Sequence, residues 1–426
     1  MILNMKKILV ISNNCLSRGD NNGRTMDNII HGWKSDKIAQ FYIQNSYPDS
    51  SVCENFFRVT DVEALKSIWQ GQKGKIINQS IQDYNQGILS KTTPSKRNPL
   101  TMIFRNIVWN LRRWEGMDFH NWLDGFNPDV VLLQVGDSSF MFKIALRIAK
   151  RYNIALVVFN SEGYFFQDAS YMKAASKFSN LFYPIFIDNY RKSFKKMMDY
   201  CSNAIYISDE LRNIYSTRFM IPSSVIYTPT GFNSYSYKES LSIDNLVFSY
   251  IGNLGLNRHV PLIEIAKKLK SFNTSLKLNV YGNILTDDVR VALLSCNEIE
   301  YKGAINYSEV NEVIRNSDIL LHVESSDPRF KEILKFGFST KIADSLMSGR
   351  LFLLYAPPYV ACTKYILGEL ASVVATSTEE LTILLKKVMT NSEFRYNSCL
   401  KEIEIAKKNH SYFHNDEKFS TIINSL

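Results

Sequence analysis

The sequence is poor in the residues that define several large classes of protein. It has 18 glycines and 11 prolines in 426 residues, which excludes collagen-like and low-complexity architectures. Its six cysteines are scattered without a Cys-x-x-Cys pair, so we expect a reducing cytoplasm rather than a zinc site or a disulfide framework. No run approaches the roughly 20 apolar residues that cross a bilayer. The apolar run at residues 8–12 is too short for a signal peptide.

Several chemical motifs are missing as well. No Asp-x-Asp occurs, so a metal-bridged diphosphate is not expected, and no Gly-x-Gly-x-x-Gly supports a dinucleotide site. The six histidines show no ligand-pair spacing, and His322 lies inside an apolar run, as a core residue would. We therefore expect neither a metal nor a bound cofactor.

The composition that remains is that of a folded, basic protein of two domains. Apolar residues make up 45% and charged residues 21%, enough for a packed interior. The 50 Lys and Arg against 41 Asp and Glu give a formal charge of +9. This balance favours an anionic partner: a phosphate, an anionic lipid or a nucleic acid. The sequence has no recognisable nucleic-acid-binding motif, so we expect no nucleic-acid binding.

Short β-rich runs alternate with amphipathic helical windows, which is typical of parallel α/β sheets. One series occupies residues 8–12, 40–43, 56–60, 130–135, 154–159, 204–207 and 225–227, and a second occupies 246–251, 276–281, 299–301, 319–323 and 351–355. The polar stretch 228–240 between them indicates a linker. The pattern predicts two Rossmann-like domains with parallel sheets facing each other across a cleft. Residues 1–235 and 236–410 form them, and 411–426 form a helix that packs back on the first.

Ligands of such sheets lie at the carboxyl ends of the strands, so the loops there are the candidate sites. The first strand is followed by Gly19, Asn22, Gly23 and Arg24, which lead into a helical window. Glycines allow a close backbone approach to a ligand, although an ordinary turn with a solvated arginine fits equally well.

The first strand of the second series ends in Gly252 and Asn253, and Arg258 then opens a helical window. Backbone N–H groups and a guanidinium at a helix start suit a diphosphate. The alternative is a capped turn with an exposed arginine.

A third segment, residues 335–350, places Ser339, Thr340 and Lys341 at the start of a short helix that Gly349 ends. Asp344 follows one turn later on the side of Lys341. The two form either a surface ion pair or, as we favour, a site for a phosphate and a ribose.

This third segment resembles the donor motif of GT-B glycosyltransferases, specifically the retaining family-four group of bacterial polysaccharide assembly. The motif has two glutamates eight positions apart. Here Phe336 stands at the first position and Asp344 at the second, ribose-binding one. The resemblance implies that Arg258 and Lys341 hold the diphosphate of the donor. It also assigns Gly252, Asn253, Tyr281, Gly282, Ala304, Ile305, Ser339 and Thr340 to the donor site, and Gly19, Asn22, Gly23 and Arg24 to an acceptor-side loop.

The resemblance implies transfer of a sugar from a nucleotide-diphosphate sugar to a glycan or lipid-linked acceptor, with retention and without a metal. The nucleotide sugar is then a co-substrate and no cofactor is needed. Glu162, after an interior strand, is the best carboxylate candidate for catalysis, although an ordinary loop glutamate fits equally well. A nucleotide-sugar epimerase of the same fold is an alternative. A catalytically weak partner subunit is another, because Phe336 replaces the first glutamate.

Two basic amphipathic windows, residues 98–114 and 186–200, bear on localisation. Such helices either lie on an anionic membrane or cover a core. We therefore expect a cytoplasmic protein, with peripheral contact at the inner face of the membrane as a second expectation.

Overall fold

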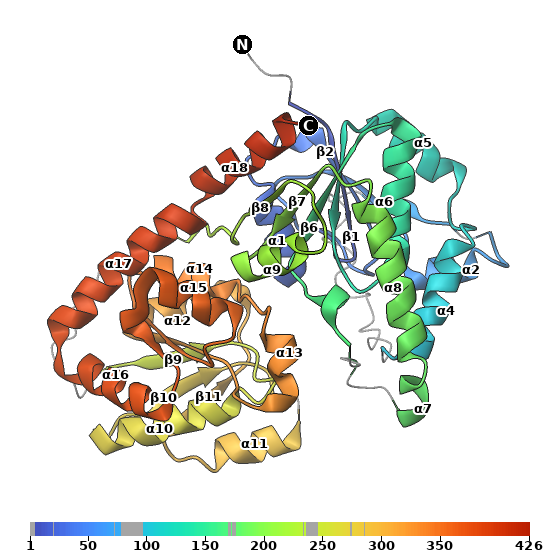
Figure 1. Cartoon of the computed structure of the whole chain (residues 1–426). Coiled ribbons are helices and arrows are strands. Elements are labelled where there is room, and N and C mark those ends of the chain that lie inside the picture. The colour runs from blue at the N-terminus through green and yellow to red at the C-terminus, as the bar shows by residue number, and fades with distance from the viewer. Residues whose placement is uncertain are drawn as a thin grey trace. The chain divides into compact units, whose positions relative to one another are not determined.

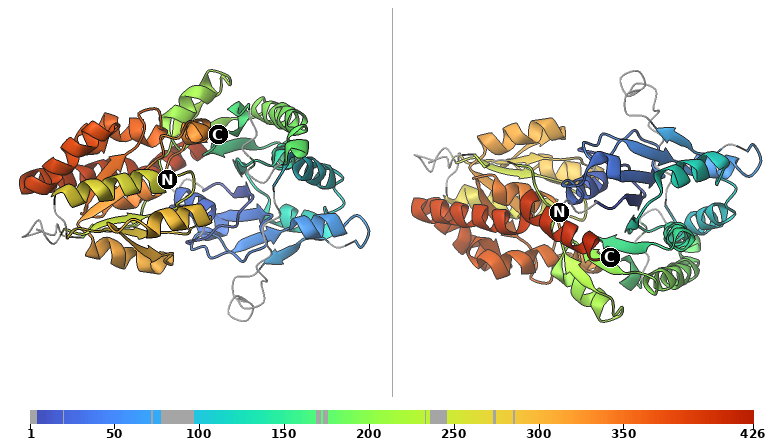
Figure 2. Two further views of the ribbon diagram at one scale, coloured as in Figure 1. Left: turned by 90° about the horizontal axis from the view of Figure 1, so that it is seen from below. Right: turned by 90° about the horizontal axis from the view of Figure 1, so that it is seen from above.

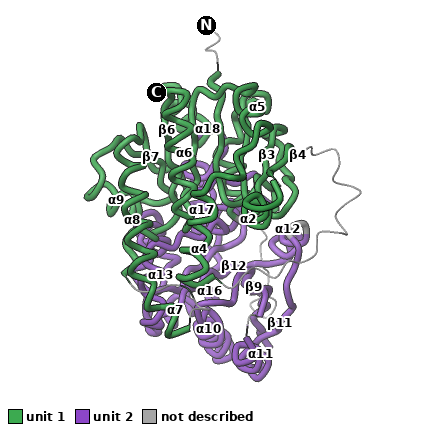
Figure 3. Tube along the Cα trace, turned by 90° about the vertical axis from the view of Figure 1, so that its right-hand side faces the viewer, with its two compact units in different colours: residues 1–227, 415–426 green, residues 228–414 purple. Residues whose placement is uncertain are grey.

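The computed structural model describes residues 5–426 except 20, 72, 78–96, 169–171, 173–175, 233, 236–245, 273–274 and 285. The chain forms two compact units (Figure 3). Unit 1 consists of Met1–Tyr227 with Asn415–Leu426, and unit 2 of Thr228–His414. The predicted boundary at residue 236 lies outside the described residues.

Unit 1 is built on a sheet with helices around it (Figure 1). Its described strands are β1 (Ile8–Ser12), β2 (Ile38–Tyr42), β3 (Asn55–Arg58), β4 (Lys75–Ile77), β5 (Val130–Gln134), β6 (Ala155–Asn160), β7 (Asn203–Tyr206) and β8 (Ser223–Val225). Its helices are α1 (Asn21–Ile29), α2 (Asp61–Lys66), α4 (Pro99–Asn110), α5 (Met117–Phe126), α6 (Ser139–Tyr152), α7 (Lys177–Asn180), α8 (Tyr183–Met198), α9 (Asp209–Ser216) and most of α18 (Tyr412–Asn424).

The strand order of this sheet is β4-β3-β2-β1-β5-β6-β7-β8, and only the β3–β4 pair is antiparallel among the described strands. The order reverses direction between β1 and β5, where Ile8 pairs with Val130. Both strands are buried along their whole length, which is why they read as continuous apolar runs. A ligand site in unit 1 is therefore expected at the carboxyl ends of β1 and β5.

Unit 2 repeats the design with a wholly parallel sheet in the order β11-β10-β9-β12-β13-β14 over its described strands. These are β9 (Phe248–Ile251), β10 (Leu278–Tyr281), β11 (Ile299–Gly303), β12 (Ile319–Val323), β13 (Leu351–Tyr355) and β14 (Val374–Ala375). Its helices, drawn yellow to red in Figure 2, are α10 (His259–Phe272), α11 (Asp287–Leu294), α12 (Tyr307–Asn316), α13 (Lys331–Leu334), α14 (Lys341–Met347), α15 (Ala361–Leu370), α16 (Thr378–Thr390) and α17 (Ser392–His410). Here the switch point lies between β9 and β12.

Two Rossmann-like units are thus confirmed, while some element boundaries differ from the prediction. The strand expected at residues 225–227 lies at Ser223–Val225, and the short strands β4 and β14 were not predicted. Helix α1 begins at Asn21, so Gly23 and Arg24 lie in its first turns and not in a loop before it. A Cβ atom at Gly23 would stand 2.1 Å from the carbonyl oxygen of Cys15. The glycine therefore serves the close packing of this turn against the β1–α1 loop.

The two basic amphipathic windows form helices that differ in what they bury. Helix α4 begins with a capping box of Asn98 and Thr101, and its apolar residues Phe104 and Ile107 are 56% and 54% exposed. In α8, by contrast, the apolar face is buried and covers the core of unit 1; it consists of Ile187, Tyr190, Phe194, Met197 and Met198. No helix among the described residues is long and apolar enough to span a membrane.

Candidate functional site

The switch point of unit 2 holds a buried ion pair between Arg258 and Glu324. Arg258 donates two hydrogen bonds to the carboxylate, from Nε to Oε2 at 2.7 Å and from a terminal nitrogen to Oε1 at 2.9 Å. Glu324 directly follows β12 and is 6% exposed, and Arg258 precedes α10. The charge of Arg258 and the imidazole of His322 lower the pKa of Glu324 against the opposing effect of burial. Glu324 is therefore an ionised partner that fixes the Arg258 fork.

The loop between β9 and α10 is shaped to present Arg258. Leu256 and Asn257 both adopt left-handed backbone angles, with φ of 58° and 56°. Two such non-glycine residues in succession are strained, and strain of this kind persists where the surroundings hold it. The Asn257 side chain donates a hydrogen bond of 2.8 Å to Asp327, which ties the loop to the segment after β12.

Lys341 is the second cation of this site and the first residue of α14. Burial and the nearby charge of Arg258 lower its pKa to about 8, against the opposing effect of Glu324. Glu324 balances only one of the two cations, so the desolvated cluster keeps a net positive charge that favours an anionic ligand. Ser339 and Thr340 precede Lys341, and the Ser339 hydroxyl accepts a long contact of 3.4 Å from its backbone N–H.

Three glycines at the ends of β9, β10 and β11 bring their backbones together. A Cβ atom at Gly282 would lie 2.0 Å from the carbonyl oxygen of Gly252, and Gly303 has a φ of 83°. The Gly282 backbone N–H donates to Gly303, and the Tyr301 hydroxyl donates to the Gly282 carbonyl at 2.7 Å. The remaining residues that the resemblance assigned to the donor site lie at the same strand ends and are partly buried or exposed: Asn253, Tyr281, Ala304 and Ile305.

Asp344 is engaged within unit 2. Its Oδ1 accepts a hydrogen bond of 2.5 Å from the hydroxyl of Thr230, and the side chain is 6% exposed. Thr230 also donates its backbone N–H to His410. Phe336, at the position of the first glutamate, is 6% exposed and belongs to the packed interior. No carboxylate is present at that position to contact a sugar.

Sequence reasoning missed Glu324, whereas the burial of His322 on β12 agrees with the core residue expected there. The imidazole Nε2 lies 3.4 Å from the Glu324 carboxylate, so His322 borders the site while being buried on β12. The strand predicted at residues 319–323 was the signal that could have revealed Glu324, since the residue after an interior strand lies at the carboxyl edge of the sheet.

Unit 1 has a polar cavity of about 160 Å³ at its own switch point. It is lined by residues that follow β1, β5 and β6, with Asn22 from α1: the lining includes Asn13, Gln134, Asp137, Glu162 and Tyr164. Arg97 also lines it and pairs with Asp137 at 2.9 Å. Burial, together with the charge of Asp137, raises the pKa of Glu162 to about 7. Glu162 can therefore accept or release a proton near neutral pH.

The predicted acceptor-side loop contributes only partly to this cavity. Asn22 lines it, and Gln134 donates to the Asn22 carbonyl at 3.1 Å. Gly19, Gly23 and Arg24 are not among the lining residues described. Over the described part of the chain, no group of three or more His, Cys, Asp or Glu side chains is arranged to hold a metal ion.

No protein-family model matches the chain, and no curated protein matches its sequence. Its structure is nevertheless similar to solved structures over nearly its whole length. Anabaena Alr3699/HepE, in complex with UDP, matches with a TM-score of 0.61 at 11% identity, over 99% of this chain and 100% of that chain. Sucrose-phosphate synthase from Thermosynechococcus elongatus gives 0.61 at 10% identity, over 99% of both. The lipopolysaccharide outer core galactosyltransferase WaaB gives 0.54 at 12% identity, over 98% and 99%.

These similarities define the architecture. The chain has the GT-B fold and resembles nucleotide-sugar glycosyltransferases of that fold in structure, as the donor-like motif indicated. At identities of 10–12% the likeness shows the fold alone.

Proposed function

We propose that the protein is a glycosyltransferase that uses a nucleotide-diphosphate sugar. The observation that carries this proposal is the buried cluster of Arg258, Glu324 and Lys341 at the switch point of unit 2. A diphosphate with two or three negative charges relieves the repulsion between the two cations. The complexes of HepE with UDP and with UDP-glucose support a nucleotide of this kind.

In the proposed reaction the bond between the sugar and the diphosphate breaks, and negative charge develops on the departing phosphate. Arg258 and Lys341 stabilise that charge from fixed positions in a desolvated site, where such groups act most strongly. The strand-end glycines Gly252 and Gly282 leave room for the nucleotide, and Asn253, Tyr281, Ala304, Ile305, Ser339 and Thr340 line its path. The resemblance assigns the ribose to Asp344, whose Oδ1 also accepts a hydrogen bond from the Thr230 hydroxyl. Transfer proceeds with retention, and the departing phosphate helps to accept the proton of the acceptor.

Unit 1 supplies the acceptor side of this proposal. Its cavity is polar, and hydroxyl groups of a glycan match the amide and carboxylate groups that line it. We propose that Glu162 assists the departing phosphate in accepting the proton of the acceptor, and its pKa of about 7 supports that role. We propose a glycan or lipid-linked acceptor of bacterial surface polysaccharide assembly, met by a cytoplasmic protein at the inner face of the membrane. WaaB, whose name places it in lipopolysaccharide assembly, supports this class of acceptor.

The test is incubation of the purified chain with a panel of nucleotide sugars, with products identified by NMR. Release of a nucleoside diphosphate, by transfer or by hydrolysis, supports the proposal. An epimerised nucleotide sugar without release identifies an epimerase. The buried Phe336 favours a third candidate, a catalytically weak partner subunit, and binding of a donor without turnover identifies it.

A further inference from the structure

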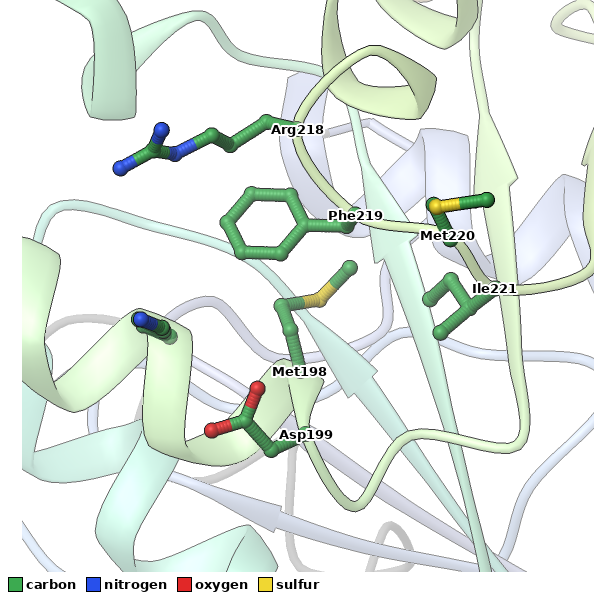
Figure 4. Close-up of a pocket in the computed structure, with 7 residues that line it drawn as sticks. Met198, Asp199, Arg218, Phe219, Met220 and Ile221 are labelled. Atoms are coloured by element: carbon green, nitrogen blue, oxygen red, sulfur yellow. The ribbon is translucent and has the colours of Figure 1, made fainter.

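Two adjoining cavities of unit 1, away from the switch point, share a pair of basic side chains. The first, of about 450 Å³, lies between the end of α8 and the connection from α9 to β8 (Figure 4). The second, of about 420 Å³, lies beside the loop after β6 and the middle of α8. Lys195 and Arg218 line both. The two cavities therefore form one groove, which we call the Lys195–Arg218 groove.

The cations of this groove exceed the carboxylates that partner them. Arg191 pairs with Asp168 and Lys192 pairs with Asp188, each at 2.7 Å. Lys195 and Arg218 have no ion-pair partner among the described residues. Asp199 lines the first cavity, and in the described structure it forms no ion pair with either of them. Lys195 and Arg218 therefore share a concave surface with a single carboxylate, and the net positive charge that remains favours binding of an external anion.

Further positive charge lies on the neighbouring helix. Lys143 of α6 is partly buried, and burial together with the charge of Lys196 on α8 lowers its pKa. Helices α6 and α8 pack side by side (Figure 1). Lys143 and Lys196 are thus a second pair of cations in proximity, which extends the positive surface from the groove along α8.

The groove is bordered by an apolar side chain that points into solvent. Met220 is 99% exposed, and the adjacent Phe219 is 8% exposed. The Phe219 ring packs edge-on against Phe165 at 5.2 Å and against Phe194 at 5.5 Å between centroids. The chain around Met220 is therefore anchored, and Arg218 and Met220 lie on either side of Phe219 in the same loop (Figure 4).

One exposed side of α8 also combines apolar and basic side chains. Ile185, Lys192 and Lys196 recur at seven and four residues, which places them on one side of the helix. Ile185 is 58% exposed, and Lys192 and Lys196 are exposed. The stripe is apolar near the start of α8 and basic near its end, where the groove lies.

We propose that this surface docks on an anionic lipid bilayer, with the phosphate of a lipid headgroup in the Lys195–Arg218 groove and Met220 inserted at the interface. Charge complementarity favours this occupant, since basic side chains near an anionic leaflet each strengthen binding and apolar tips insert beside them. A soluble phosphate would use the cations and leave Met220 and Ile185 in water. The proposal rests on the membrane placement proposed above and names the surface responsible, and it does not depend on the transfer reaction or on which donor is used.

The experiment is co-sedimentation of the full chain with vesicles of phosphatidylglycerol and phosphatidylcholine, compared with vesicles of phosphatidylcholine alone. We expect binding to the anionic vesicles at low salt, release at high salt, and no binding to the neutral vesicles. Lys195→Gln with Arg218→Gln should weaken binding about 30-fold, at about 1 kcal/mol for each charge removed. Met220→Ser should weaken it as well. All three residues are exposed or lie at a cavity mouth, so these variants should fold.

Matched controls distinguish the effect of this surface from the effects of net charge and of exposed apolar side chains elsewhere. Lys386→Gln with Lys401→Gln removes two exposed charges of unit 2, and Met117→Ser changes another exposed methionine, 77% exposed, of unit 1. Both controls should bind vesicles as the wild type does. The docking proposal is overturned if the wild type ignores anionic vesicles at low salt, if the controls weaken binding as much as the groove variants, or if inorganic phosphate binds the groove while vesicles do not. Donor hydrolysis by the groove variants should be unchanged, so failure of docking and failure of the proposed transfer reaction are separate results.

Discussion

Arg258 is held by Glu324 through two hydrogen bonds of 2.7 and 2.9 Å at the point where the strand order of unit 2 reverses. The pair fixes the orientation of the guanidinium before any ligand arrives, which is how a charged group avoids reorganisation during a reaction. It also neutralises one of two neighbouring cations, so Arg258 and Lys341 can both remain in a desolvated site.

Removal of either cation should reduce turnover of the donor. Lys341→Ala leaves the charge that develops on the diphosphate under-compensated, at about 2–4 kcal/mol of barrier, or about 30- to 1,000-fold in rate. Arg258→Ala strands the buried Glu324 charge and should also destabilise unit 2. The informative variant is therefore Arg258→Gln with Glu324→Gln, which removes both charges. Arg290→Gln with Asp287→Asn, at the exposed Arg290–Asp287 pair of α11, is the matched control and should leave kcat unchanged. Undiminished turnover in the double variant rejects the assignment of Arg258.

Donor binding should weaken as the pH rises above about 8. The pKa of Lys341 is lowered to about 8 in the free protein, so its positive charge is lost over that range. The folded pKa of Lys341 lies below its unfolded value, so the unfolded state binds more protons than the folded state between about pH 8 and pH 10. The free energy of unfolding should therefore rise over that range. Calorimetric titration of a nucleoside diphosphate against pH measures the first effect, and thermal unfolding measures the second. Lys341→Arg should flatten both profiles. A donor affinity independent of pH up to about 10 contradicts the placement of Lys341 at the diphosphate.

The transfer rate should fall as the pH drops below about 7, because Glu162 then becomes protonated. Its pKa is raised to about 7 by burial and by Asp137, so a proton-accepting role requires the pH to exceed about 7. Ionisation of this group is unfavourable in the folded state, so its contribution to stability declines as the pH rises from its unfolded value through about 7. Glu162→Gln should therefore remove the acid limb of kcat and raise the melting temperature at about pH 8 but not at about pH 5. A variant with the wild-type pH–rate profile shows that Glu162 is an ordinary loop residue.

Turnover should not require a divalent metal, because the sequence has no Asp-x-Asp to hold one on the donor. Activity measured in excess EDTA should equal that in buffer alone, with a metal-dependent glycosyltransferase as the positive control for chelation. Loss of activity in EDTA and its return with manganese or magnesium would show that the cationic side chains are not sufficient.

The fold was predictable because its interior strands are continuous apolar runs. β5 and β12 are buried on both faces, so their five-residue runs stand out from the polar loops beside them. β4 and β14 escaped prediction because they are three and two residues long at sheet edges and carry little pattern.

The candidate site could be predicted only for residues that a local sequence pattern marks. Arg258 and Lys341 each follow a strand–loop–helix pattern in the sequence, and both lie in the cluster of unit 2. Glu324 belongs to it through a contact across 66 residues, which no local pattern encodes. The same holds for Asp344, whose bond to Thr230 spans 114 residues. Helical windows revealed the apolar face of α8 but not that it is buried, because coverage depends on what packs against it.

The most direct test is a calorimetric comparison of nucleoside diphosphates with the corresponding monophosphates, for each common base, on the wild type and on Lys341→Ala. If Arg258 and Lys341 bind a diphosphate, one base should give a diphosphate that binds at least about tenfold more tightly than its monophosphate. The difference should disappear in Lys341→Ala, while the weaker binding of the monophosphate persists. Equal affinities of diphosphate and monophosphate for every base, or a preference that survives in Lys341→Ala, would contradict a nucleotide-sugar site at this switch point.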